Sequence, residues 1–167
     1  IGLGMALGQR LDKIESKTYV LVGDGEIAEG QIWEAAMAAS AFRADNLVAI
    51  VDRNGLQANR RTNERFDTGD IIAKFLSFGW HVIEIDGHDM RQILDALNQA
   101  DYVKGMPTVI VANTVKGKGV SFAENVVGYH NGMLTEETYR QALKELAEQD
   151  NAADQDWSGV QRQEAHR

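Results

Sequence analysis

The chain has 167 residues, 44% of them hydrophobic, so one domain with a substantial core is expected and two domains are disfavoured. Its 25 acidic and 17 basic side chains give a formal net charge of −8, which disfavours binding to nucleic acid or anionic lipid because no basic surface is available. The absence of cysteine excludes disulfide scaffolds, thiolate metal sites and thiol nucleophiles, and it fits a reducing compartment, which we take to be the cytoplasm.

The apolar pattern predicts strands and helices that alternate along the chain. The opening IGLGMALGQRL is typical of the middle of a glycine-punctuated helix, and since the chain begins with Ile rather than Met we expect the native amino terminus to be missing. In chain order we predict a strand at 18–22, a helix at 29–42, a strand at 47–51, a helix at about 71–78, a strand at 80–86, a helix from 89 to about 100, a strand at 107–115 and a helix at 135–148. None of the apolar runs is long enough to span a membrane.

This alternation predicts the α/β class, with a parallel sheet flanked by helices on both faces. We expect one domain over residues 1–148 and an irregular or partner-docked tail over 149–167, where no apolar period survives. Thr135 is expected to cap the last helix without a full capping box, because Thr138 stands where Glu or Gln is required. Ligands of such sheets bind beyond the carboxyl ends of the strands, so the residues there are the candidates for function.

Two oxygen-bearing side chains follow the first two predicted strands. Asp24 and Asn54 are separated by thirty positions, about one strand-helix-strand unit, which would bring both to one edge of the sheet. A carboxylate and an amide oxygen suit Mg²⁺, which prefers a few protein ligands together with substrate phosphates and water. Gly23 and Gly25 leave space for backbone amides to contact a phosphate. The sequence therefore predicts a cradle for a metal and a diphosphate.

The same residues also fit purely structural turns. Gly-Asp-Gly is a common turn, and Asn54 with Gly55 is a strong signal for a hairpin. The segment LQANRR that follows is polar and lacks the alternation that a partner strand needs, which argues against that hairpin.

Dinucleotide binding is a further alternative. The run from Gly23 to Ala28 satisfies G-x-G-x-x-G/A after a strand, and Asp52 ends the next strand, where a ribose-binding acid belongs. Three acidic residues lie where a pyrophosphate would have to bind without a metal ion, and they would repel it: Asp24, Glu26 and Glu29. A divalent ion would remove this repulsion, so we favour a metal-bridged diphosphate.

Five ordered blocks carry a family resemblance and cover most of residues 19–137. They are GDGEIAEGQIWEAAMAAS, NLVAIVDRNGLQ, FGWHVIEIDGHD, NTVKGKGVSFAEN and YHNGMLTEE. The first two contain Gly-Asp-Gly and, about thirty residues later, an asparagine, and in this the chain resembles the thiamin-diphosphate enzymes. The five blocks together are most similar to transketolase, in particular the amino-terminal subunit of its split, two-polypeptide form. KGKG is not a Walker A loop, because Gly119 stands where Ser or Thr is required.

The resemblance implies roles for particular residues. Asp24, Asn54 and the backbone carbonyl of Leu56 would hold Mg²⁺ or Ca²⁺, and Gly25 would offer its amide to the diphosphate. His130 matches a histidine that reaches the diphosphate and a substrate hydroxyl. Glu29 and Glu34 match acids at the subunit interface that relay protons, although a helical spacing of five tends to separate the two side chains. His81 and His88 lie in blocks that we interpret as structural.

The resemblance also implies a reaction and a partner. The chain would supply the metal-diphosphate half of a transketolase that moves a two-carbon ketol unit from a ketose to an aldose or its phosphate, as in the pentose phosphate pathway. A carboxy-terminal subunit would carry the pyrimidine-binding domain and the activating glutamate, and homodimerisation would give a heterotetramer. Alternatives are another thiamin-diphosphate subunit, E1α-like or deoxyxylulose-phosphate-synthase-like, or a Rossmann-type module. Two departures bear on independent activity: residues 58–61 replace an Ile-Asp-Gly-like stretch, and a segment expected upstream of Ile1 is absent.

Overall fold

The computed structural model describes residues 1–164, with side chains described as far as residue 150. The chain divides into two compact units, Ile1–Thr114 and Val115–Arg167. The first unit holds all the strands that were predicted from the sequence, and the second follows the last of them.

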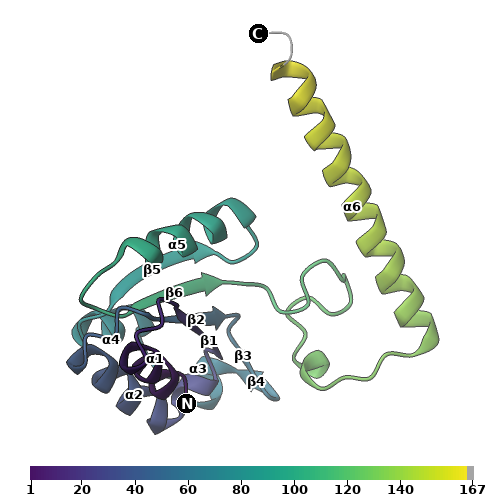
Figure 1. Ribbon diagram of the computed structural model, residues 1–167. Helices are drawn as coiled ribbons and strands as arrows, with labels where there is room; N and C mark the ends of the chain where they lie inside the picture. The colour runs from purple at the N-terminus through teal and green to yellow at the C-terminus, as the bar shows by residue number, and fades with distance from the viewer. Residues whose placement is uncertain (165–167) are drawn as a thin grey trace. The chain divides into compact units, whose positions relative to one another are not determined.

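A parallel sheet of four strands forms the centre of the first unit (Figure 1). In the order in which they pair, the strands are β1 (Thr18–Gly23), β2 (Leu47–Arg53), β6 (Thr108–Asn113) and β5 (His81–Asp86). The last strand in the chain therefore lies between β2 and β5. Because every pair is parallel, all four carboxyl ends lie at one edge, as the α/β prediction requires.

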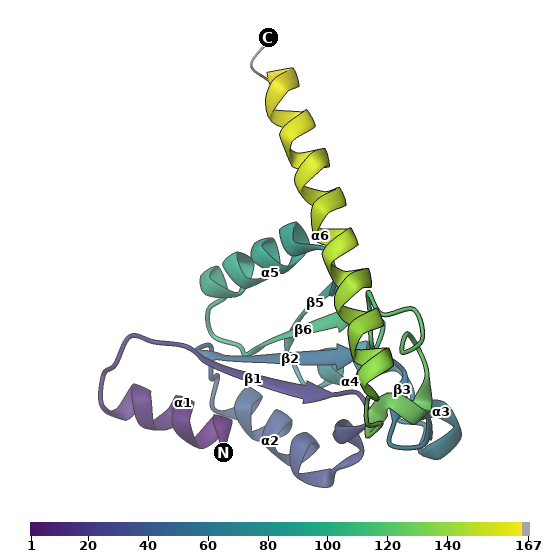
Figure 2. The ribbon, with the colours of Figure 1, turned by 90° about the vertical axis from the view of Figure 1, so that its right-hand side faces the viewer.

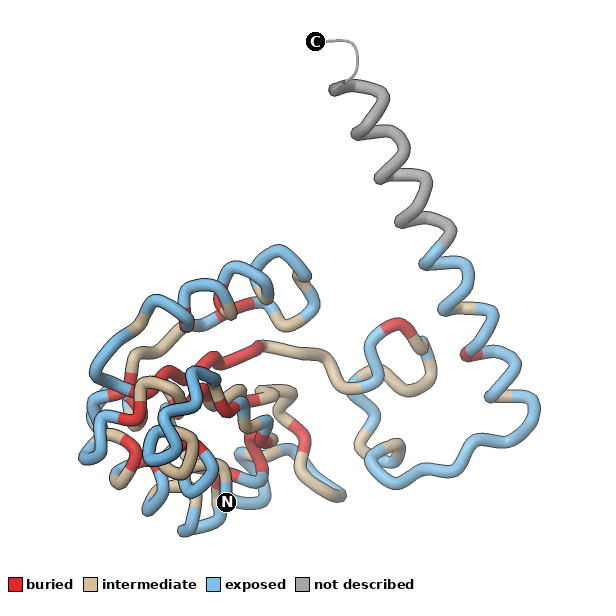
Figure 3. Tube along the Cα trace, viewed as in Figure 1, coloured by how far each residue is buried: buried red, intermediate tan, exposed pale blue. Residues whose placement is uncertain are grey.

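Helices cover both faces of this sheet (Figure 2). The helices that cover it are α1 (Gly2–Leu11), α2 (Gly30–Ala41), α4 (Ile71–Ser77) and α5 (Met90–Tyr102). Helices α1, α2 and α4 pack on one face, in a core that includes Val51 and Val111, whereas α5 packs on the other, against Ile85 and Ile110. The buried residues of the first unit lie mainly along the strands and at single positions of the helices (Figure 3). Two apolar layers thus hold the sheet and fix its carboxyl edge.

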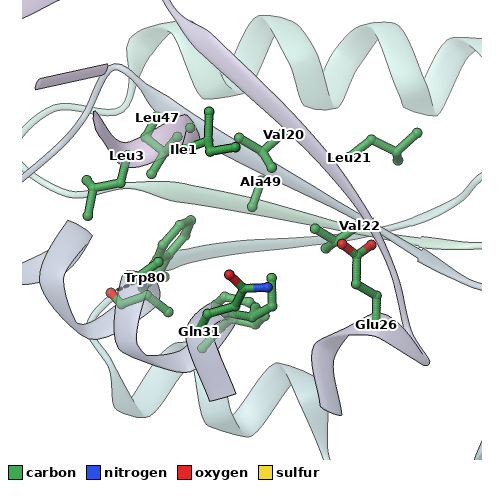
Figure 4. Close-up of a pocket in the computed structure, with 15 residues that line it drawn as sticks. Ile1, Leu3, Val20, Leu21, Val22, Glu26, Gln31, Leu47, Ala49 and Trp80 are labelled. Carbon is green, nitrogen blue, oxygen red and sulfur yellow. Dashed lines mark hydrogen bonds between the residues drawn. The ribbon is translucent and has the colours of Figure 1, made fainter. Parts of the chain in front are cut away.

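Trp80 joins α2 to the sheet. It is buried, its indole Nε1–H donates to the carbonyl oxygen of Ala36 at 2.9 Å, and its ring makes an edge contact with Phe75. The small side chains of α2 leave an apolar cavity of about 240 Å³ beside Trp80 and the first two strands, with Glu26 and Gln31 in its lining (Figure 4). Trp80 and Ala36, which the hydrogen bond joins, both lie in the wall of this cavity.

A small hairpin follows β2. Strands β3 (Leu56–Gln57) and β4 (Arg60–Arg61) pair antiparallel and lead into the short helix α3 (Thr62–Arg65). The sequence did not predict these elements. The hairpin rejected at Asn54-Gly55 is indeed absent, because β2 pairs with β1 and β6, but LQANRR turns back on itself at Ala58, whose φ is +53°.

The second unit consists of a loop, the 3-10 helix η2 (Val127–His130) and α6 (Glu136–Glu164). Thr135 caps α6 as predicted, and Thr138 returns the contact: the Thr138 N–H donates to Thr135 Oγ1 at 3.2 Å and the Thr135 N–H donates to Thr138 Oγ1 at 2.8 Å. A threonine hydroxyl therefore does here what Glu or Gln does in a capping box.

Helix α6 is longer than predicted. The sequence predicted a helix to residue 148 and an irregular or docked tail from 149, whereas the helical backbone continues to Glu164. Proline is absent from residues 149–164, so no residue there removes a backbone donor from the helix, although the segment has no apolar period. The two compact units divide after Thr114, whereas one domain over residues 1–148 was expected from the sequence. The domain boundary at residue 148 stays a prediction. No helix within residues 1–164 combines the length and the apolar character needed to cross a membrane.

Candidate functional site

Asp24 and Asn54 follow neighbouring strands at the same edge of the sheet. Gly23, at the end of β1, is paired in register with Asp52 of β2, so the two turns begin side by side. Asp24 is only 4% exposed, and its Oδ2 accepts a hydrogen bond from the backbone N–H of Gly55 at 2.7 Å. The thirty-residue spacing therefore brings the carboxylate to the Asn54-Gly55 turn, as the sequence predicted.

The amide of Asn54 has both ends engaged. Its Oδ1 accepts from the N–H of Leu56 at 3.0 Å, and its Nδ2 donates to Asp52 Oδ2 at 3.1 Å. The first contact closes a local turn that carries the chain from β2 into the buried residue Leu56. The three residues predicted to ligate a metal, Asp24, Asn54 and Leu56, thus belong to one hydrogen-bonded assembly.

The hairpin is tied to the Gly-Asp-Gly turn by further contacts. Gln57 Nε2 donates to the carbonyl oxygen of Gly25 at 2.9 Å. The two ends of the hairpin are joined to each other, because the N–H of Thr62 donates to the carbonyl oxygen of Gly55 at 3.0 Å. A Cβ atom at Gly25 would lie 2.5 Å from Gln57 Cγ, so only glycine allows this close approach. The fold therefore requires Gly25 for packing as well as for its amide in the predicted cradle.

A network of polar side chains fixes the ends of β2, β6 and β5 beside this turn. Arg53 Nε donates to Asn113 Oδ1 at 2.6 Å, its terminal nitrogen pairs with Glu84, and Asn113 Nδ2 donates to Glu84 Oε1 at 3.1 Å. The hydrogen bond from Asn113, and then Arg53, hold the pKa of Glu84 below its ordinary value. Sequence reasoning missed this network, because its members lie on three strands whose order in the sheet was unknown.

The two glutamates expected at an interface are on the surface of the first unit. Glu29 precedes α2 as its N-cap residue and makes no side-chain capping bond, and Glu34 lies one turn into the helix; both are exposed. Glu26, in the 3-10 helix η1 (Glu26–Ala28), accepts a hydrogen bond from the N–H of Gly23 at 3.2 Å. The Gly23 amide therefore already donates to a carboxylate oxygen of the same turn.

The dinucleotide alternative fits the structure poorly. In that motif the glycine turn opens an α-helix directly, whereas here η1 intervenes and α2 begins only at Gly30. Asp52, the candidate ribose acid, uses Oδ1 to accept from the Thr114 hydroxyl and Oδ2 to accept from Asn54. Each of its two oxygens therefore accepts a hydrogen bond from a residue at the carboxyl edge of the sheet.

The remaining candidates from the sequence lie outside the Gly-Asp-Gly and Asn54-Gly55 turns. His130 ends η2 in the second unit and is exposed. In the same unit Gly117 and Gly119 of the KGKG loop have φ of +75° and +90°, and Gln149 of α6 donates to the Gly119 carbonyl at 2.7 Å, which makes this loop an ordered turn. His81 Nε2 lies 3.2 Å from Gln99 Nε2, in keeping with its structural interpretation.

The donor set at the carboxyl edge fits a hard divalent cation and its diphosphate. Within residues 1–150 no three His, Cys, Asp or Glu side chains gather into a metal cluster, so a cation bound beside Asp24 would also need amide and carbonyl oxygens, which Asn54 and Leu56 carry. A Cβ at Gly23 would meet nothing within 4 Å, so there is open space next to the turn. The arrangement can therefore accept Mg²⁺ or Ca²⁺ with phosphate oxygens.

Comparison with known proteins gives consistent matches. Residues 8–154 match the model of the family described as transketolase, thiamine diphosphate binding domain. The chain is 43% identical over 148 residues to one subunit of the apulose-4-phosphate transketolase of Phocaeicola vulgatus, covering 89% of this chain and 53% of that protein. It is 44% identical over 144 residues to 6-deoxy-6-sulfo-D-fructose transketolase subunit SqwG of a Clostridium species, covering 86% and 52%.

A solved structure shares the fold. The chain superposes on transketolase from Campylobacter jejuni with a TM-score of 0.76 and 32% identity, covering 87% of this chain and 24% of that one. The chain spans about half the length of the curated subunits that it matches.

Proposed function

Because the chain belongs to the family of the transketolase thiamine diphosphate-binding domain, we propose that it supplies the metal-diphosphate half of a two-subunit, transketolase-like transferase. The hydrogen bond from the Gly55 N–H to Asp24 Oδ2 carries this proposal, since it joins the two strand-end turns that such a site needs. Two relatives with more than 40% identity are subunits of split enzymes, which supports the two-polypeptide form.

The metal would be held by three oxygens of the first unit. Asp24 contributes a carboxylate that is already buried and held in place by Gly55, Asn54 contributes its amide oxygen, and Leu56 its backbone carbonyl. Oxygen ligands of this kind fit Mg²⁺ and Ca²⁺. The single protein carboxylate leaves positive charge on the cation, which draws in the two phosphates of the cofactor.

Backbone amides of the Gly-Asp-Gly turn would bind the diphosphate directly. Gly25 and Gly23 carry no side chain that would keep phosphate oxygens away from their N–H groups, and Gly23 already donates to a carboxylate in this structure. When bound, thiamin diphosphate supplies a nucleophilic carbon and an electron-accepting ring, which allow a ketose C2–C3 bond to be broken and a two-carbon unit to be passed on. The chain's own task is to hold the cofactor by its charged end.

Two further residues have proposed roles in proton handling. The imidazole of His130 would donate a hydrogen bond to the diphosphate and to a substrate hydroxyl. Glu29, exposed at the start of α2, would exchange a proton with groups of a neighbouring subunit, and Glu34 is its proposed companion. Both roles rest on the family resemblance of the blocks around these residues.

The proposed partner is a carboxy-terminal subunit that carries the pyrimidine-binding domain, with two such pairs forming a heterotetramer. Its proposed substrates are sugar phosphates, and the reaction is ketol transfer of the pentose-phosphate type in the cytoplasm. The relatives' names point to substrates with an anionic group, a phosphate in one and a sulfonate in the other.

The test is ligand-dependent stability of the chain co-expressed with that partner subunit. Thermal unfolding is followed with Mg²⁺ and thiamin diphosphate, and separately with NAD. We expect the first pair alone to stabilise the complex, by about 2.7 kcal/mol at a hundred times its Kd. Asp24→Asn should abolish this shift, whereas Asp95→Asn, the same change at an exposed position of α5, should leave it intact. Stabilisation by NAD, or by neither ligand, contradicts the proposal.

A further inference from the structure

The end of β2 carries a chain of hydrogen bonds that the family motifs do not account for. Asp52 Oδ2 accepts from Asn54 Nδ2 at 3.1 Å, and Asp52 Oδ1 accepts from the hydroxyl of Thr114. Thr114 follows β6, and its N–H donates to the Arg53 carbonyl at 3.2 Å, so it is itself fixed to the end of β2. Asp52 is therefore anchored on one side by the neighbouring strand and on the other by Asn54.

These contacts set the orientation of the Asn54 amide. An ionised carboxylate can only accept hydrogen bonds, so the NH₂ end of Asn54 must face Asp52 and the oxygen must face the other way. On that other side the N–H of Leu56, which can only donate, reaches Oδ1 at 3.0 Å and favours the same orientation, and the residue between them, Gly55, donates to Asp24. The geometry points to Asp52 as a positioning residue that keeps the Asn54 oxygen, rather than its NH₂ group, directed to the cation site, with Thr114 holding Asp52 in place.

The distinction matters because only one end of an amide can ligate a cation. The two ends are nearly equal in size, and packing alone does not choose between them, whereas hydrogen-bond partners do. Partners of this outer kind commonly change metal affinity by about 10- to 100-fold. Asp52 and Thr114 also line an apolar cavity of about 260 Å³ together with Ile50 and Ile110, so few polar groups compete for the carboxylate. The inference deepens the proposed function and rests on it.

The experiment measures Mn²⁺ affinity, by the loss of the free-ion EPR signal, for the complex of the chain and its partner at saturating thiamin diphosphate. Asp52→Asn keeps the shape but replaces the carboxylate by an amide that can pair with Asn54 in either orientation. We expect it to weaken Mn²⁺ binding by about 10- to 100-fold. Thr114→Val, which removes only the anchor, should weaken binding less, and Asp95→Asn on the exposed side of α5 should have no effect.

A double-mutant cycle separates positioning from a general structural role. In the Asn54→Ala background no amide remains to be oriented, so Asp52→Asn should then cause no further loss of Mn²⁺ affinity. An equal loss in both backgrounds, or no loss in either, overturns the inference while leaving the metal site standing. If Asn54→Ala itself leaves Mn²⁺ affinity unchanged, the proposed function is refuted at its metal site, and the inference falls with it.

Discussion

Alanine at position 25 would test the contact on which the candidate site is built. Gly25 has φ −72° and ψ −33°, a conformation open to any residue, so alanine adds no backbone strain there. Its Cβ, however, would lie 2.5 Å from Gln57 Cγ and 2.8 Å from Gln57 Cβ. A rotation of the glutamine side chain moves the Cγ away but not the Cβ, so the hairpin itself must shift.

The expected cost follows from these contacts. Overpacking at a buried position costs about 1–3 kcal/mol, and loss of the hydrogen bond from Gln57 to the Gly25 carbonyl about 1 kcal/mol. Alanine returns about 0.4–1 kcal/mol by restricting the unfolded chain. We expect a net loss of about 2 kcal/mol in the free energy of unfolding, which for a chain of this length lowers Tm by about 4–8 °C.

Urea unfolding followed by circular dichroism measures this loss. Gly30→Ala is the matched control, because a Cβ there meets nothing within 4 Å at the first residue of α2, and it should leave stability unchanged or slightly raised. Replacing Gln57 by glycine in the Gly25→Ala background removes the colliding atoms and should recover more than half of the loss. A Gly25→Ala variant within about 0.5 kcal/mol of the wild type, a margin of the size of ordinary surface effects, would refute the packing described.

Three other substitutions probe the packing, the capping and the charge network. Trp80→Phe removes the indole N–H that binds the Ala36 carbonyl and part of a buried ring, and should lower the free energy of urea unfolding by about 2 kcal/mol; a loss below about 0.5 kcal/mol would contradict the role of that bond. Thr138→Val removes the reciprocal cap of α6 and should reduce helicity, with a loss of about 1 kcal/mol, while unchanged circular dichroism would exclude a capping role. The pKa of Glu84 is lowered first by the Asn113 hydrogen bond, so its stabilising effect is present above its ordinary pKa and is lost as pH falls through the lowered value. Glu84→Gln should therefore be less stable than the wild type at neutral pH, and the difference should shrink in acid; parallel curves of stability against pH would refute this.

The main sheet and its helices were predictable because apolar periodicity decides them. Residues 47–51 and 107–115 are rich in branched apolar side chains; the first range lies within β2, and the second contains β6 with one extra residue before it and two after it. Such strands are buried on both faces, so the residues along them are mostly apolar, and a short continuous run reveals this directly. The spacing of Asp24 and Asn54 was predictable for a related reason: a parallel crossover returns both strand ends to the same edge.

The hairpin after Asn54 could not be predicted in the same way. Strands β3 and β4 have two residues each, too few to show an alternation. Gln57 reaches Gly25 and Thr62 reaches Gly55, and neither contact leaves a pattern in the local sequence. A segment with one buried residue, Leu56, and a few polar contacts offers no repeat for a periodicity to detect.

The role of Asp52 shows what the order of the strands adds to the sequence. Seen alone, an acid at the end of the second strand fits a ribose-binding residue, and the sequence supported that alternative. Thr114 lies 62 positions further on, and only the insertion of β6 beside β2 brings its hydroxyl to Asp52. Once that contact is made, one oxygen of the carboxylate accepts from the neighbouring strand and the other from Asn54, so both are already bonded within the protein. The order of the strands thereby turns the residue that best supported dinucleotide binding into support for a metal site next to it.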